Sequence, residues 1–264
     1  MRPDLTLTLI QTSLAWENPA ANLEMLQKKI EAVRDPGDVI VLPEMFTTGF
    51  SMRPEAFAEP MDGRSVRWMR ELARKAGAVV CGSLIIGEND RFFNRFIWMP
   101  PTGESRFYAK RHLFTLGGED RHYAAGSEQV TIAHNGWRIR PLICFDLRFP
   151  VWLRNRVVGN EAEYDLLLCV ASWPDRRAFA WRALMPARAI ENQCFAVAVN
   201  RVGADGNGVY HTGDSMVVDP LGETLLALTH LEVVATVTLS AATLDDLRRQ
   251  LPFLAGGDRF TLER

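Results

Sequence analysis

The chain has 264 residues, of which 47% are hydrophobic and 23% charged, and its formal net charge is −2. These values are typical of a globular protein and provide no basic field that would attract nucleic acid. No apolar run approaches the roughly 18–20 residues of a membrane span. Four single cysteines spread through apolar runs do not form a disulfide framework. We therefore expect residues 1–264 to form one reduced, cytoplasmic domain.

The first third of the chain alternates strand and helix patterns. Residues 5–11 alternate like a strand, and residues 19–33 have helical spacing. A short apolar strand is predicted at 39–42 and an amphipathic helix at 65–75. The apolar run at 78–86 is continuous, which suits a strand covered on both faces.

Two hairpins and further alternation follow. Residues 92–99 and 105–109 flank a Pro-Thr-Gly turn, and residues 129–134 and 137–143 flank Asn135-Gly136, the strongest short hairpin signal. The remaining predicted elements are a short helix at 150–158, strands at 165–171, 195–200, 215–219, 223–227 and 231–239, and helices at 177–192, kinked or restarted at Pro186, and 244–250. This order predicts a sheet-rich, layered α/β fold.

Cys144 lies where the apolar run before it ends, inside the segment 140–150. A strand that delivers a thiol into a turn leaves it at the end of a rigid element, which suits a nucleophile. The alternative is a buried small hydrophobe, which is the commoner role of a single cysteine. We assign that alternative to Cys81, Cys169 and Cys194.

Three charged residues supply what thiol chemistry needs. Glu44 and Lys110 each follow a predicted strand, and Glu119 lies in a Gly-rich polar loop. A carboxylate can take the thiol proton, and an ammonium with a backbone N–H can hold an oxyanion. A second carboxylate can orient the lysine. Each residue alone is more typical of solvated loop charge, and the combination with Cys144 is what indicates a site.

The chain resembles the nitrilase, or carbon–nitrogen hydrolase, superfamily. The matching segments follow the family's order and cover nearly the whole chain: 42–50, 110–114, 119–126, 140–150, 187–193 and 213–222. The resemblance implies a four-layer α-β-β-α sandwich, usually paired as a dimer. It also implies Glu44 as general base, Lys110 as oxyanion stabiliser and Cys144 as nucleophile, with Glu119 matching the family's additional glutamate.

Segments 144–150 and 171–174 are similar to the omega-amidase branch, which hydrolyses short oxo-dicarboxylate monoamides such as 2-oxoglutaramate. Arg148 is the candidate for the substrate's anionic end, because an arginine forks onto a carboxylate. Its alternative role is a structural salt bridge with Asp146 or another acid. Phe145 and Trp173 are candidate pocket walls, although core packing suits Trp173 equally well. The Phe145 N–H is the expected second oxyanion donor.

Other functions remain open at this level. Relatives within the same superfamily act on N-carbamoyl amino acids, aliphatic amides, nitriles or deaminated glutathione, and a non-catalytic binding scaffold is a further alternative. The scattered histidines lack metal-ligand spacing, so we expect no metal and no organic cofactor. The expected partners are a small-molecule amide and a second copy in a homodimer, with neither nucleic acid nor membrane. Arg176, Arg177 and the Gly-rich loop 203–208 are expected at the solvated surface.

Overall fold

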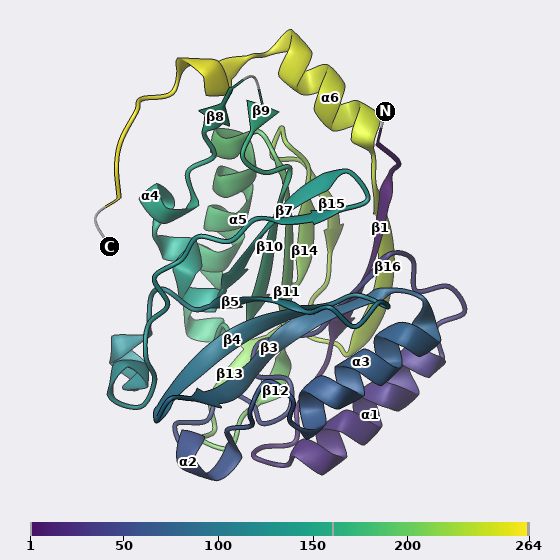
Figure 1. Cartoon of the computed structure of the whole chain (residues 1–264), viewed down its shortest axis with the longest axis vertical. Helices are drawn as coiled ribbons and strands as arrows, with labels where there is room; N and C mark the ends of the chain where they lie inside the picture. The colour runs from purple at the N-terminus through teal and green to yellow at the C-terminus, as the bar shows by residue number, and fades with distance from the viewer. Residues whose placement is uncertain (1, 160, 263–264) are drawn as a thin grey trace.

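The computed structural model describes residues 2–159 and 161–262. Two six-stranded sheets lie face to face, and helices cover their outer faces (Figure 1). This arrangement confirms the predicted α-β-β-α sandwich. No helix in the described ranges is long and apolar enough to cross a membrane.

The first sheet has the strand order β16-β1-β2-β3-β4-β5. Its strands are β1 (Leu5–Gln11), β2 (Val39–Val41), β3 (Val79–Glu88), β4 (Arg91–Met99), β5 (Arg106–Ala109) and β16 (Val233–Leu239). Strands β1, β2 and β3 are parallel, and α1 (Pro19–Glu31) and α3 (Arg64–Ala76) connect them and pack on the outer face. The short helix α2 (Pro54–Phe57) lies between β2 and α3 in the chain.

The second sheet has the order β15-β14-β11-β10-β7-β6. Its strands are β6 (Ile132–His134), β7 (Trp137–Ile143), β10 (Leu166–Ala171), β11 (Phe195–Asn200), β14 (Met216–Val218) and β15 (Thr224–Ala227). The helix α5 (Ala178–Asn192) connects the parallel strands β10 and β11. The predicted hairpin turn between β6 and β7 is confirmed, because Asn135 and Gly136 both have positive φ, as a type I′ turn requires.

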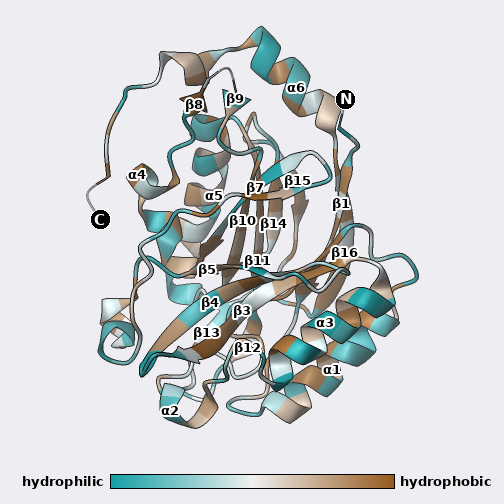
Figure 2. Cartoon of the chain, viewed as in Figure 1, coloured by the Kyte–Doolittle hydropathy of each residue, from teal (hydrophilic) through white to brown (hydrophobic). Residues whose placement is uncertain are grey.

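Side-chain alternation in the strands builds two apolar layers. Leu5, Leu7 and Leu9 of β1 face the core between the sheets, whereas Ile10 joins the layer beneath α1 and α3. Successive strand residues point to opposite faces, so one strand serves both layers. Figure 2 shows the result, with apolar strands and with helices that are polar on their outer sides.

Some predicted elements differ from the structure. The helix predicted at 150–158 ends early as α4 (Pro150–Leu153), and the two-residue strands β8 (Val157–Val158) and β9 (Glu161–Ala162) follow. Asn155 explains the early end, because its backbone N–H donates to Asn192 Oδ1 instead of to a helical carbonyl. Its buried side-chain amide also donates to the carbonyls of Tyr164 and Asn192. The helix α5 runs through Pro186 without a restart. The loop 203–208 belongs to a hairpin of β12 (Val202–Ala204) and β13 (Tyr210–Thr212).

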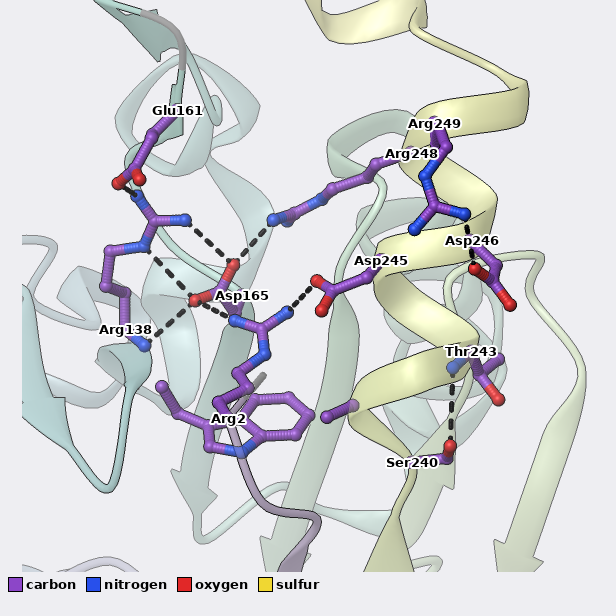
Figure 3. A network of polar contacts seen from close by, with 12 residues as sticks. Arg2, Arg138, Glu161, Asp165, Ser240, Thr243, Asp245, Asp246, Arg248 and Arg249 are labelled. Carbon is purple, nitrogen blue, oxygen red and sulfur yellow. Dashed lines mark hydrogen bonds and ion pairs between the residues drawn. The ribbon is translucent and has the colours of Figure 1, made fainter.

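One buried carboxylate ties both ends of the described chain to the second sheet. Asp165 accepts ion pairs from Arg2 at 2.7 Å, from Arg138 at 3.2 Å and from Arg248 at 2.5 Å (Figure 3). Arg248 lies on α6 (Ala241–Gln250), and Arg2 also pairs with Asp245 of that helix. We call these four residues, Asp165 with Arg2, Arg138 and Arg248, the Asp165 cluster.

Candidate active site

The four predicted site residues meet between the two sheets. Glu44 follows β2, Lys110 follows β5 and Cys144 follows β7, while Glu119 lies in the 3₁₀ helix Glu119–Arg121. The carboxyl ends of strands are where loops are free to place functional groups on a rigid frame. The structure thus brings the four predicted positions together, each on a loop or short helix beside a strand end.

Lys110 forms two buried ion pairs. Its Nζ donates to Glu44 Oε1 at 2.9 Å and to both Glu119 carboxylate oxygens, at 3.0 and 2.9 Å. All three side chains are fully buried. We call these three residues the Lys110 cluster. Isolated charges at such depth would cost several kcal/mol each, so the three groups depend on one another.

The charges of the Lys110 cluster shift one another's protonation. Burial alone would lower the pKa of Lys110, but Glu119 and Glu44 outweigh it and raise that pKa above its ordinary value. Burial raises the pKa of Glu119, with the Lys110 charge opposing and the Glu44 charge adding to the rise. The cluster thus holds a firmly charged ammonium between two acids, of which Glu119 has a raised affinity for a proton.

Cys144 stands at the start of a 3₁₀ helix, Cys144–Arg148, with an unusual backbone angle φ of +47°. A non-glycine residue in this region is strained and is frequently functional. The residue is 9% exposed and lines a cavity, so it is reachable but largely covered. Burial and the Glu44 charge raise the pKa of Cys144 well above its ordinary value, against the opposing Lys110 charge. The resting group is therefore a thiol, and a base must remove its proton before it can attack.

The sequence did not point to two further groups that hold the site. The buried Asn94 of β4 donates through Nδ2 to Glu44 Oε1 at 2.8 Å and to Glu119 Oε1 at 3.2 Å. The backbone N–H of Ser172, just after β10, donates to Glu44 Oε2 at 2.8 Å. Together they fix both oxygens of the Glu44 carboxylate. The sequence could have pointed to Asn94, because it is a polar residue inside an apolar strand. It could not have pointed to Ser172, because a backbone N–H leaves no signal in the sequence.

A small cavity opens onto the thiol. Its volume is about 160 Å³, below the roughly 300–1,000 Å³ of pockets for drug-sized ligands, so it suits a small molecule. Cys144, Phe145, Arg148 and Trp173 line it, as predicted. A larger hollow of about 860 Å³ lies beneath the segment after α6, but none of the four catalytic candidates lines it.

The structure corrects the alternative given for Arg148. Asp146 is occupied by the Tyr108 hydroxyl, at 2.8 Å, by His112 Nδ1 and by backbone N–H groups, and not by Arg148. Arg148 instead lies over the Trp173 ring, with Cζ 4.8 Å from the ring centroid. Trp173 serves in both roles considered for it, since it packs on Trp181 and also walls the cavity. Arg176 and Arg177, which were predicted at the solvated surface, are exposed and half-buried respectively, and both also line the cavity.

Comparison with known proteins places this geometry in a family. The carbon-nitrogen hydrolase family model matches residues 6–249. The chain belongs to the carbon–nitrogen hydrolase family. The omega-amidase YafV of Escherichia coli K12 is 43% identical over 98% of this chain and 99% of its own, and the 2-oxoglutaramate amidase of Bacillus subtilis 168 is 32% identical over 93% and 98%.

A solved structure matches equally completely. XC1258 from Xanthomonas campestris, a CN-hydrolase superfamily protein with an arsenic adduct in its active site, superposes with a TM-score of 0.97. The two chains are 44% identical, and the match covers 99% of this chain and 100% of the other. The carbon–nitrogen hydrolase fold predicted from the resemblance is confirmed.

Proposed function

We propose that this carbon–nitrogen hydrolase is a cysteine-dependent omega-amidase, which hydrolyses 2-oxoglutaramate and similar short oxo-dicarboxylate monoamides to the acid and ammonia. The observation that carries the proposal is a thiol beside the buried Lys110 cluster, at the floor of a small cavity with arginines in its wall. The names of relatives that match over nearly their whole length support the same activity.

The residues divide the work of amide hydrolysis between them. Glu44 takes the proton of Cys144, and the sulfur attacks the amide carbon. Lys110 and the backbone N–H of Phe145 hold the resulting oxyanion. Glu44 returns the proton to the departing ammonia, which leaves a thioester on Cys144. Glu44 then activates a water that releases the acid product and restores the thiol.

Glu119 acts through Lys110 rather than on the substrate. It accepts two hydrogen bonds from the ammonium and one from the backbone N–H of Phe114, at 2.6 Å. These contacts hold Nζ in place while charge develops on the substrate oxygen. In this proposal Phe145 and Trp173 form the cavity walls, and Arg148 binds the carboxylate at the far end of the substrate.

Ammonia release tests the proposal. We expect turnover of 2-oxoglutaramate and succinamate, little or none of glutamine, an N-carbamoyl amino acid and a simple nitrile, and no turnover of any of them by Cys144→Ala with an unchanged circular dichroism spectrum. Turnover of a different substrate would keep the mechanism and overturn the substrate assignment. Full activity in Cys144→Ala would overturn the mechanism.

We also propose that the protein is a cytoplasmic homodimer with its one domain over residues 1–264. Exposed apolar side chains on α5 support an interface, since Phe179 is 85% and Ile190 52% exposed. The four cysteines are unpaired, as in reducing compartments. Light scattering after size exclusion should give twice the chain mass of 29.7 kDa, and a single chain mass at micromolar concentration would contradict the dimer.

A further inference from the structure

Three arginines line the active-site cavity, against one acid, Asp205, among the described residues of the lining. They are Arg148, Arg176 and Arg177, and within residues 2–159 and 161–262 none of their side chains has a hydrogen bond or ion pair to a carboxylate. Other arginines in the described ranges do have one, as Arg138 and Arg188 show. An uncompensated positive wall in a cavity is a place for an anionic ligand group.

Aromatic rings hold two of these guanidinium groups in position. The Cζ of Arg148 lies 4.8 Å from the centroid of Trp173, and the Cζ of Arg177 lies 4.7 Å from that of Phe114. Trp173 also donates from Nε1 to the backbone carbonyl of Arg177 at 2.9 Å, which joins the two stacked pairs. A guanidinium that stacks on a ring keeps its N–H edge free for a planar acceptor.

The remaining ionisable groups of the cavity do not cancel this charge. Asp205 offsets only one of the three positive charges, and its Oδ1 accepts the backbone N–H groups of Asn207 and Val209 and no arginine. Burial, reinforced by Arg201, lowers the pKa of His211 to about 4, so this side chain is neutral near pH 7. Burial lowers the pKa of Arg177, and the like charges of Arg176 and Arg148 add to this shift.

We propose that Arg177, stacked on Phe114, completes with Arg148 a two-guanidinium clamp for the substrate carboxylate, and that this clamp makes the enzyme select anionic amides over neutral ones. The inference rests on the proposed amidase function and adds a specificity residue that the sequence did not indicate. A carboxylate between two forked donors makes short, charge-assisted hydrogen bonds. A neutral amide of the same length leaves both forks unpaired in the cavity, which penalises its binding.

The first test compares an anionic and a neutral amide of similar size. We expect Arg177→Met to lower kcat/KM for succinamate by about 10- to 100-fold, mainly through KM, and for butyramide by less than about threefold. Arg177→Lys keeps the charge without the fork and should fall between Met and the wild type. Arg74→Met, an exposed arginine on α3, is the matched control and should behave as wild type. Equal losses on both amides, or no loss on succinamate, would overturn the clamp.

A binding measurement separates this inference from the amidase proposal. Titration calorimetry of succinamate into Cys144→Ala, with and without Arg177→Met, requires no turnover. We expect the dissociation constant to rise about tenfold or more when Arg177 is replaced. An unchanged constant, or no binding to Cys144→Ala itself, overturns the clamp. If Arg177→Met weakens binding but the wild-type enzyme releases no ammonia, the clamp is supported and the amidase proposal is rejected.

Discussion

The Lys110 cluster has more acids than bases, whereas the Asp165 cluster has more bases than acids. The first surrounds one ammonium with two carboxylates, and all three side chains are fully buried. The second surrounds one fully buried carboxylate with three arginines that remain 10%, 29% and 16% exposed. Two of those arginines also reach outward to the exposed acids Asp245 and Glu161 (Figure 3).

The difference explains why one cluster suits chemistry and the other suits stability. An excess of buried carboxylate can be cancelled by a proton, so the Lys110 cluster has a place for the proton that Cys144 must lose before it attacks. An excess of guanidinium cannot be cancelled in that way, since arginine does not lose its proton in proteins. The Asp165 cluster instead relies on water and surface acids around its arginines. The sign of the excess charge thus separates the two clusters: the negative Lys110 cluster can take up a proton, and the positive Asp165 cluster keeps its charge and stabilises the fold.

The largest expected effect comes from Glu44→Gln. Removal of the base should lower kcat/KM for succinamate by about 10³-fold, because general base catalysis contributes roughly 10²–10⁴-fold. Stability should change by no more than about 1 kcal/mol, since the relief of carboxylate repulsion and the lost acceptor for Ser172 oppose each other. Ammonia release and urea unfolding measure the two quantities. Glu104→Gln, at an exposed acid, is the control. Full activity of Glu44→Gln would show that the Lys110 cluster does not supply the base.

The next effect is on stability alone. Asp165→Asn should lower the free energy of unfolding by about 3 kcal/mol, because it leaves three arginines without their shared partner. Its kcat/KM at 25 °C should remain at the wild-type value. Urea unfolding followed by circular dichroism gives the first number. A loss below about 1 kcal/mol, comparable to that of the exposed control Asp246→Asn, would show that solvent already balances the arginines.

The pH dependence of that loss sharpens the comparison. Although burial opposes them, Arg138, Arg248 and Arg2 lower the pKa of Asp165 below its ordinary value of 3.8. A lowered pKa in the folded state stabilises fully above the ordinary value, and this stabilisation is lost as the pH falls through the folded pKa. The stability gap between wild type and Asp165→Asn should therefore be constant above about pH 5 and narrow below about pH 4. A gap that widens on acidification would refute the assignment.

A smaller effect is expected for the residue that links the two acids. Asn94→Leu removes the amide that donates to Glu44 and Glu119. We expect the activation free energy to rise by about 2 kcal/mol, which lowers kcat roughly 30-fold with little change in KM. Asn94→Asp should be worse, since it adds a third carboxylate to the cluster. A shifted pH–rate profile in Asn94→Leu would show that Asn94 positions Glu44. Loss of stability with an unchanged profile would show a structural role only.

The smallest effect marks the limit of the Asp165 cluster. Arg249 is the residue after Arg248 and pairs with Asp246 instead of Asp165. The side chains of Arg249 and Asp246 are both mostly exposed. Arg249→Ala should change the free energy of unfolding by less than about 0.5 kcal/mol. Arg248→Ala, measured by thermal unfolding under the same conditions, should lower the melting temperature further. Equal melting temperatures in the two variants would mean that the buried ion pair with Asp165 stabilises the protein no more than an exposed one.

The fold could be predicted from the sequence because local patterns carried it. The strand 137–143 and the start of the helix at Pro19 match the structure, since alternation, helical spacing and the Asn135-Gly136 turn are all short-range signals. The failure at 150–158 has a long-range cause. Asn155 bonds a residue 37 positions away, which no local pattern encodes.

The site was predictable to the same extent. Glu44, Lys110, Glu119 and Cys144 each stand in a local motif, so the sequence proposes them as site residues without the fold. Asn94 lies 50 residues from the carboxylate that it positions, and the packing of the sheets alone brings the two together. Arg177 looked like solvated charge because its ring partner, Phe114, is distant in the chain.

The wide spacing of the Asp165 cluster along the chain has a consequence for biosynthesis. Arg2 and Arg138 are made before Asp165, but Arg248 follows it by 83 residues. At about 5–20 residues per second, a ribosome needs roughly 4–17 seconds to supply that last arginine. During this interval α6 does not yet exist, and Asp165 lacks the ion pair from Arg248.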